Sequence, residues 1–164
     1  SDSLYARCRT GTRCLRSCYR SASHPMIRSG LTTIILDAYN ANPSSMRASV
    51  GNFCEMPGEH KVVILGEMLE LGTENAAAHE EIVRLTQQGN FDRIFLIGNN
   101  FEHCADKCNF ITWFKDTESF MEYLKSHPLN DSFIFIKGFV FFANRYLYIN
   151  HSLLDNLLFL KSKY

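Results

Sequence analysis

Residues 31–46 read LTTIILDAYNANPSSM, and this stretch decides the kind of sheet that the chain can build. Up to Asp37 it is apolar and β-branched without alternation, which is typical of a strand buried on both faces. A polar turn follows. Pro43 then stands where a helix begins, with Asn42 as its N-cap. The stretch therefore predicts a buried strand, a polar turn and a capped helix in direct succession.

The same succession repeats along the chain. Thr73 is the expected cap of the second helix, which Gly89 ends, and Asp116 is a cap candidate for the third. The pattern predicts strands at 31–37, 61–66, 91–98, 110–114 and 132–138, helices at 43–56, 73–89 and 116–127, a short helix at 99–108 and a loop at 67–72. Strands that alternate with helices indicate an α/β fold, doubly wound, with a mostly parallel sheet of five or six strands.

Composition limits the classes of function. The 164 residues suffice for one domain, 46% of them are hydrophobic, and the formal net charge is zero, so the whole chain favours neither nucleic acid nor a membrane surface. No apolar run reaches the roughly 18 residues of a membrane helix. The N-terminus has no apolar segment of a secretory signal, so the cytoplasm is the expected location.

The six cysteines are irregularly spaced and do not indicate a disulfide framework. Cys104 and Cys108 with His103 offer an alternative, a zinc site, but they do not make a closed set of four ligands. Free thiols are the preferred interpretation, and no metal ligand is assigned to this chain.

Functional residues are expected where the strands end. Ligands of an open parallel sheet bind at the carboxyl ends of its strands, and those ends here read DAYNANP, GEMLELG, GNN and KG. These turns are polar or glycine-rich and could hold a nucleotide or another anion. The chain contains neither GxGxxG after a strand nor GxxxxGK[ST], so it lacks both common phosphate-binding loops.

Five stretches in this order resemble the C-terminal domain of Mur ligases. They are DAYNANPSSM (37–46), KVVILGEMLELG (61–72), AAHEEI (77–82), DRIFLIG (92–98) and SFIFIKG (132–138). The resemblance covers residues 26–138. It is strongest with the MurF type, which adds D-Ala-D-Ala to UDP-MurNAc-tripeptide during synthesis of the peptidoglycan precursor.

The resemblance implies a reaction that this domain shares with two others. Such ligases use ATP and Mg²⁺ to form an acyl phosphate, which the amine of D-Ala-D-Ala then attacks. A central domain carries the P-loop and most of the metal ligands, and a further domain holds the UDP-sugar. The C-terminal domain closes over ATP and contributes nucleotide and dipeptide contacts, so alone it is not expected to catalyse. UDP-MurNAc-tripeptide and D-Ala-D-Ala are the implied partners.

Three residues after the first strand are implied on the nucleotide side. By resemblance Asp37 contacts the ATP ribose or its surroundings, and Asn40 offers an amide contact. Tyr39 either stacks on the ligand or packs internally. The alternative for Asp37 is a turn acid that caps the next segment.

Four residues are implied on the side of the incoming dipeptide. Asn42 is expected to contact it or simply to cap its helix, and Glu67, Met68 and Glu70 lie in a loop that is either a substrate neighbour or a solvated turn. His79, beside two glutamates in a predicted helix, is expected on the surface.

Lys137 and Gly138 match the start of the family's strand-end motif. A lysine there suits an anionic acyl phosphate, which gives Lys137 a catalytic role and Gly138 a substrate contact. The alternative is a surface lysine whose stem lies on apolar neighbours.

Both flanks leave the family pattern. Residues 1–25 belong to a basic arm, with six arginines and one acid up to Arg28, and are expected to be disordered. The Ser and Arg that the family has directly after Gly138 are absent. Residues 139–164 form an aromatic and leucine-rich tail, expected to be helical and able to self-associate. One or both flanks are interpreted as out of frame, which leaves a free-standing nucleotide-binding module or an inert interaction fragment as alternative functions.

Overall fold

A computed structural model describes residues 26–37, 41–107 and 110–138. The predictions for Tyr39, Asn40 and the flanks 1–25 and 139–164 lie outside these residues. The strands are β1 (Met26–Ser29), β2 (Thr32–Asp37), β3 (Lys61–Gly66), β4 (Arg93–Ile97), β5 (Ile111–Phe114) and β6 (Phe133–Lys137). The helices are α2 (Pro43–Glu55), α3 (Asn75–Gln88) and α4 (Thr117–Ser126), with the 3₁₀ segments η1 (Gly72–Glu74) and η2 (Asn99–Lys107).

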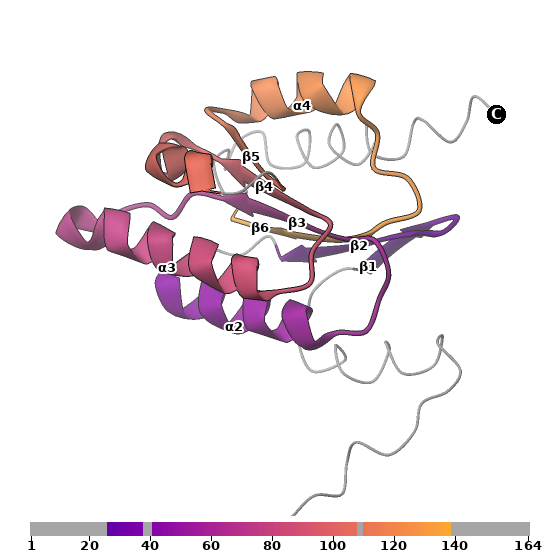
Figure 1. Ribbon diagram of the computed structural model, residues 1–164, viewed down its shortest axis with the longest axis horizontal. Coiled ribbons are helices and arrows are strands. Elements are labelled where there is room, and N and C mark those ends of the chain that lie inside the picture. Colours follow the sequence, from indigo (N-terminus) through magenta and orange to yellow (C-terminus); the bar gives the residue numbers. More distant parts are fainter. Residues whose placement is uncertain (1–25, 38–40, 108–109, 139–164) are drawn as a thin grey trace, which may run out of the picture.

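The strands form one sheet in the order β1-β2-β6-β3-β4-β5. All neighbours are parallel except β1 and β2, which are antiparallel. Figure 1 shows α2 and α3 side by side on one face of the sheet and α4 on the other. The α/β prediction with a mostly parallel sheet is confirmed. In the described part of the chain no helix has the length and apolar character needed to cross a bilayer.

Strand β1 was missed by the sequence analysis. It pairs with β2 from Met26 opposite Ile35 to Ser29 opposite Thr32, and Gly30 turns the hairpin at φ 57°. A glycine adopts this left-handed conformation readily, whereas other residues do so at a cost. The four-residue strand is too short to show a period, which explains why the pattern did not predict it.

Capping side chains fix two helix starts as predicted. Asn42 accepts a hydrogen bond from the Ser45 backbone N–H at 2.9 Å, and the Ser45 hydroxyl accepts one from the Asn42 N–H, which completes a capping box. Asp116 caps α4 by accepting from the backbone N–H of Ser119. Thr73 is not the cap of α3, because η1 leads directly into that helix and Glu74 occupies the cap position without a side-chain bond. Gly89 ends α3 as expected.

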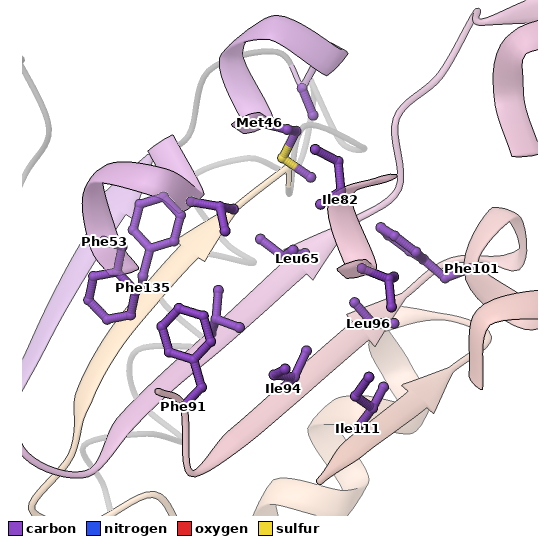
Figure 2. Close-up of a cluster of buried hydrophobic side chains, with 14 of the residues drawn as sticks. Met46, Phe53, Leu65, Ile82, Phe91, Ile94, Leu96, Phe101, Ile111 and Phe135 are labelled. Atoms are coloured by element: carbon purple, nitrogen blue, oxygen red, sulfur yellow. The ribbon is translucent and has the colours of Figure 1, made fainter. Parts of the chain in front are cut away.

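The larger of two apolar clusters fills the space between the sheet and helices α2 and α3. Figure 2 shows Met46, Phe53 and Ile82 from these helices above Leu65 and Leu96 of the sheet. Phe53 lies against the rings of Phe91, Phe133 and Phe135, with ring centroids 5.6, 5.0 and 5.2 Å away. The inward-facing residues predicted for α2, namely Met46, Val50 and Phe53, are all buried.

A second apolar cluster lies under α4. Phe120 and Tyr123 of this helix contact Phe95 of β4 and Phe114 of β5, with ring centroids 5.2–5.9 Å apart. Leu124 joins the same cluster. Apolar side chains on both faces of β3, β4 and β6 explain why these strands read as continuous apolar runs.

Lys61 joins the start of β3 to the end of α2. Its ammonium group donates hydrogen bonds to the carbonyls of Phe53, Cys54 and Met56 at 2.6, 2.9 and 3.0 Å. These carbonyls belong to the last turn of α2 and to its C-cap residue Met56, where backbone acceptors lack helical partners and the helix dipole favours a cation. Burial lowers the pKa of Lys61, and the three acceptors offset that cost of desolvation.

We expect Lys61→Met to destabilise the domain. The methionine fills much of the same volume but leaves three carbonyls without their donor, which should cost about 1.5–3 kcal/mol of unfolding free energy. Urea denaturation followed by circular dichroism measures the loss. Lys125→Met is the matched control, because Lys125 is exposed and, among the described residues, pairs with Glu122 on the surface of α4. That control should change stability by less than about 0.5 kcal/mol, and equal losses for both variants would contradict the role of Lys61.

Candidate functional site

A buried ion pair closes the carboxyl edge of the sheet at β2 and β6. The ammonium of Lys137 lies 2.6 Å from Oδ2 of Asp37, and the two side chains are 1% and 2% exposed. Ser49 of α2 donates its hydroxyl to the same carboxylate oxygen at 2.8 Å. Removing two charges from water is costly, so the pair depends on this short contact and on the added hydrogen bond.

The local sequence explains how the pair forms. Asp37 and Lys137 are the last residues of their strands, and they stand opposite each other in the parallel register of β2 and β6. Each charge follows an apolar run that fixes its strand in the core. Ser49 lies on the partly buried side of α2, which begins six residues after Asp37. Three elements thus bring two opposite charges and a hydroxyl to one point.

Gly138 follows this pair in a conformation that favours glycine. Its φ is 88°, and a Cβ atom there would lie 2.6 Å from the carbonyl oxygen of Gly66 at the end of β3. Any larger residue would therefore clash with backbone as well as strain its own. The two glycines let β6 and β3 end close together, directly beside the loop that leaves β3.

That loop, residues 67–71, is held by a second polar cluster. Glu67 accepts a hydrogen bond from the Asn100 backbone N–H at 2.9 Å, and the Glu67 N–H donates to the carbonyl of Ile97. Met68 buries its side chain completely in the core. Leu69 and Glu70 are exposed at the tip, where Glu70 has a φ of 60°. The loop thus has a fixed base and an exposed tip.

His79 lies beneath the same loop. Its Nε2 accepts a hydrogen bond from the Met68 N–H at 3.0 Å, and its Nδ1 lies 2.7 Å from the carbonyl oxygen of Asn75. The ring packs edge-on against Phe101 at 4.6 Å and is fully buried. Since Nε2 faces a donor and Nδ1 an acceptor, the neutral Nδ1–H tautomer satisfies both contacts. Burial lowers the pKa of His79, in agreement with a neutral ring.

The predicted nucleotide and catalytic residues come together only in part. Asp37 and Lys137 contact each other, and the alternative of a surface lysine is wrong because Lys137 is buried. The structure does not describe Tyr39 and Asn40. Asn42 is exposed and acts as the cap of α2, the second of its two expected roles, while its substrate contact stays a prediction.

The predicted dipeptide residues occupy different surroundings. Glu67 is half-buried and Met68 fully buried, so the side chain of Met68 serves the core, whereas Glu70 is exposed. Gly138 lies at the end of β6 against β3. Their substrate contacts remain predictions.

The expectation that His79 is a surface residue is wrong. Positions 78, 79, 82, 83 and 86 of α3 are all buried, and their spacing is that of one helical face. The histidine belongs to this face, so the helical spacing could have predicted its burial, but the adjacent glutamates suggested a surface position. Ser49, Asn75 and Asn100 were also missed, because single polar residues in helices carry no pattern that points to a partner.

Asn75 and Asn100 complete the second polar cluster. The Asn75 amide donates to the Asn100 side-chain oxygen at 2.7 Å, which links the start of α3 to η2. Across the described ranges, no group of three or more His, Cys, Asp or Glu side chains is placed to hold a metal ion. Cys54 and Cys104 are reduced thiols.

Comparison with protein families gives a match over the described domain. Residues 26–139 match the model of the Mur ligase family described as "Mur ligase, glutamate ligase domain". The match therefore covers more than half of the chain and includes both polar clusters.

Curated relatives carry one enzymatic name. The UDP-N-acetylmuramoyl-tripeptide--D-alanyl-D-alanine ligase of Rickettsia prowazekii is 32% identical over 108 residues, which are 64% of this chain and 24% of the relative. The enzyme of the same name from Escherichia coli K12 is 37% identical over 89 residues, 48% of this chain and 20% of the relative. The chain thus spans at most about a quarter of the length of these relatives.

Solved structures show the same fold. Crystal structure I of MurF from Acinetobacter baumannii superposes with a TM-score of 0.64 at 22% identity, covering 81% of this chain and 29% of that one. MurF ligase from Thermotoga maritima in complex with ADP gives a TM-score of 0.61 at 22% identity, with 85% and 31% covered.

We expect the Asp37–Lys137 pair to be strongly coupled. Asp37→Asn and Lys137→Met each leave one buried charge without its counter-ion, which should cost about 3–5 kcal/mol. The double variant should lose less than the sum, by about 1–3 kcal/mol, in urea unfolding. The exposed Arg47–Glu81 pair, 2.7 Å apart, is the control and should couple by less than about 1 kcal/mol. A coupling no larger than the control's would contradict the assigned role.

We expect His79 to make stability depend on pH. An unfolded imidazole binds its proton at about pH 6.5, whereas the folded ring binds one only at lower pH. The unfolding free energy should therefore fall as pH decreases below about 6.5, because the unfolded chain takes up the proton first. Glu67 opposes this shift and His103, paired with Glu80, reinforces it.

The measurement is the stability difference between the unaltered chain and His79→Gln from pH 8 to pH 5. The difference should shrink toward acid pH, since only the unaltered chain carries this titration. A difference that stays constant, or grows, would refute the neutral buried ring.

Proposed function

The chain belongs to the Mur ligase family, with residues 26–139 as its C-terminal domain, and from this premise we propose that the domain serves a ligase of the MurF type. Its proposed activity is the ATP-dependent addition of D-Ala-D-Ala to UDP-MurNAc-tripeptide in peptidoglycan precursor synthesis. The support is the shared name of the curated relatives together with the fold. The cytoplasmic location stays a prediction.

One structural observation carries the proposal. The sheet places the Asp37–Lys137 pair and the loop 67–71 at the carboxyl ends of β2, β6 and β3, which are three adjacent strands. Open parallel sheets bind their ligands at this edge. The charged strand ends could serve the nucleotide, and the exposed tip of the neighbouring loop could serve the dipeptide.

Asp37 is the residue proposed to face the nucleotide. A carboxylate has about four lone-pair positions, so it can accept a ribose hydroxyl in addition to Lys137 and Ser49. Because the side chain is 2% exposed, neighbouring groups at the edge must move apart before a hydroxyl reaches it. The chemistry of the donor set thus fits a nucleotide hydroxyl, and ATP would supply the phosphoryl group that activates the peptide carboxylate.

The described residues do not fit Mg²⁺. They contain no carboxylate cluster that could replace its water ligands, and the carboxylate of Asp37 is already bound to an ammonium group. Any Mg²⁺ would be held by the part of the ligase that this chain lacks, as the family resemblance implies.

Lys137 is proposed to serve the anionic reactant through its charge. Its ammonium group is bonded to Asp37. To contact an acyl phosphate, the ammonium must either leave the Asp37 carboxylate or bind both groups at once. On the dipeptide side, Glu70 is accessible at the loop tip, while Met68 offers its backbone because its side chain is buried. Asn42, Glu67 and Gly138 complete the proposed edge.

Two further functions remain as alternatives. The sequence after Gly138 departs from the family motif, so a nucleotide-binding module or an inert interaction fragment would also explain the domain. Calorimetry of the chain with ATP separates these two, because only the former binds and loses binding on Asp37→Ala.

The decisive experiment is a domain exchange in the Escherichia coli relative. One chimera carries residues 26–138 of this chain and then returns to the sequence of the relative, and a second carries residues 26–164. Phosphate release is measured with ATP, Mg²⁺, UDP-MurNAc-tripeptide and D-Ala-D-Ala. We expect turnover from the first chimera and at least about 100-fold less from the second. The second lacks the Ser and Arg that the family has after Gly138, and the loss of one side chain that donates to the transition state would cost about that much.

The isolated chain and the Asp37→Ala form of the first chimera are the controls, and neither should sustain turnover. A folded first chimera that binds UDP-MurNAc-tripeptide but releases no phosphate would contradict the proposed function. Robust turnover by the isolated chain would contradict the division of labour between domains.

A further inference from the structure

Side chains from two other elements hold both polar groups of the Met68 backbone. Its N–H donates to Nε2 of His79 on α3, and its carbonyl accepts from the amide of Asn100 on η2 at 3.4 Å. The buried thioether side chain of Met68 adds a third anchor. Met68 is therefore the fixed point between the end of β3 and the exposed Leu69 and Glu70.

We propose that His79 is a positioning residue, which sets the conformation of the loop 67–71 through the Met68 backbone and thereby the affinity of the loop for the incoming D-Ala-D-Ala. The second half of this proposal rests on the function proposed above. The first half concerns the fold alone and is tested separately. In this proposal His79 acts through the Met68 backbone and does not itself contact ATP or the dipeptide.

The geometry gives His79 a role that a plain core residue would not have. Its Nδ1–H donates to the carbonyl of Asn75, one helical turn earlier, so the ring orientation is fixed by its own helix. Nε2 is then left with a lone pair, which accepts the hydrogen bond from the Met68 N–H of the loop. A cationic ring would set two donors against each other at this point.

Few titratable groups face His79 among the described residues. Glu67 of the loop and His103 of η2 are the two that influence the ring, and His103 lies beside Glu80. The ring of Phe101 packs against the imidazole. The pocket around the imidazole thus favours a neutral group of fixed orientation, which is what holding a backbone N–H requires.

Two substitutions separate the two ring nitrogens. A glutamine side chain reaches the place of Nε2, so His79→Gln can still accept from the Met68 N–H. An asparagine side chain reaches only the place of Nδ1, so His79→Asn keeps the bond to Asn75 and loses the one to Met68. The proposal predicts that glutamine preserves the loop and asparagine releases it.

The first test follows the backbone amide of Met68 in the full chain by nuclear magnetic resonance. In His79→Asn its hydrogen exchange should accelerate by about tenfold or more, the equivalent of one hydrogen bond of about 1.4 kcal/mol. In His79→Gln the rate should stay within about threefold of the unaltered chain. The nitrogen shifts of His79 should also report the Nδ1–H tautomer.

Thr86→Ala is the control for a general loss of stability. Thr86 is buried on the same face of α3 as His79, and in the contacts that the structure gives it, its hydroxyl bonds only within that helix. It should lower the unfolding free energy without selective acceleration at Met68. Equal acceleration in Thr86→Ala and His79→Asn, or none in His79→Asn, would overturn the positioning role.

The second test uses the active chimera with residues 26–138. His79→Asn should raise the KM for D-Ala-D-Ala about tenfold, the change expected when one hydrogen bond that orders the site is lost, and leave the KM for ATP within about twofold. His79→Gln should restore the dipeptide KM. Equal changes in both KM values, or none in either, would refute the link to the dipeptide.

Failure of the two proposals can be told apart. An inactive but folded parent chimera counts against the proposed function, and it also overturns the dipeptide half of this inference. The exchange rates of Met68 in the chain itself still decide whether His79 holds the loop, since that measurement needs no substrate.

Discussion

The buried pair of Asp37 and Lys137 is the interaction on which the functional edge of this domain depends. The two residues are 100 positions apart, yet they end neighbouring strands in the same register, and their charges are almost completely removed from water. Such a pair tolerates neither a missing partner nor a shifted strand, because either change leaves a charge buried alone. It therefore fixes how β6 enters the sheet between β2 and β3. The proposed roles of Asp37 and Lys137 follow from that placement.

A second constraint acts one strand further along the edge. The loop after β3 begins at Gly66, which lies in close contact with Gly138 at the end of β6. The neutral ring of His79 accepts a hydrogen bond from the Met68 backbone of this loop. The edge thus contains a charged part and an uncharged part that are built independently, one from strand ends and one from α3 and η2. Under the proposed function, this separation would keep the nucleotide contact apart from the contact with the amine substrate. It also explains why the two parts can be tested by different variants.

Much of the fold could be predicted from the sequence because its signals are local. Continuous apolar runs located β3 and β6 to within one residue, and Asn42 with Pro43 located the start of α2. The strand ends that would form the site were identified by the same reasoning. Prediction failed where the outcome depends on a partner distant in the sequence. Thr73 was expected to cap α3, but η1 precedes that helix. The spacing of His79 in α3 fits a buried face, but the residues that contact its ring come from η2 and the loop after β3, and the adjacent glutamates suggested a surface position.

The sequence by itself determined the strands other than β1, most of the helix ends, the mostly parallel sheet and the positions where polar residues interrupt the apolar runs, since each depends on neighbours within a few residues. The tertiary structure alone decided which of those polar residues meet. Only the register of β2 with β6 turns a strand-end acid and a strand-end lysine into one ion pair, and only the packing of α3 against the loop turns a helical histidine into a backbone acceptor. The physical reason is that hydrogen bonds and buried charges need partners within about 3 Å, and the chain path that supplies them is set by the whole core.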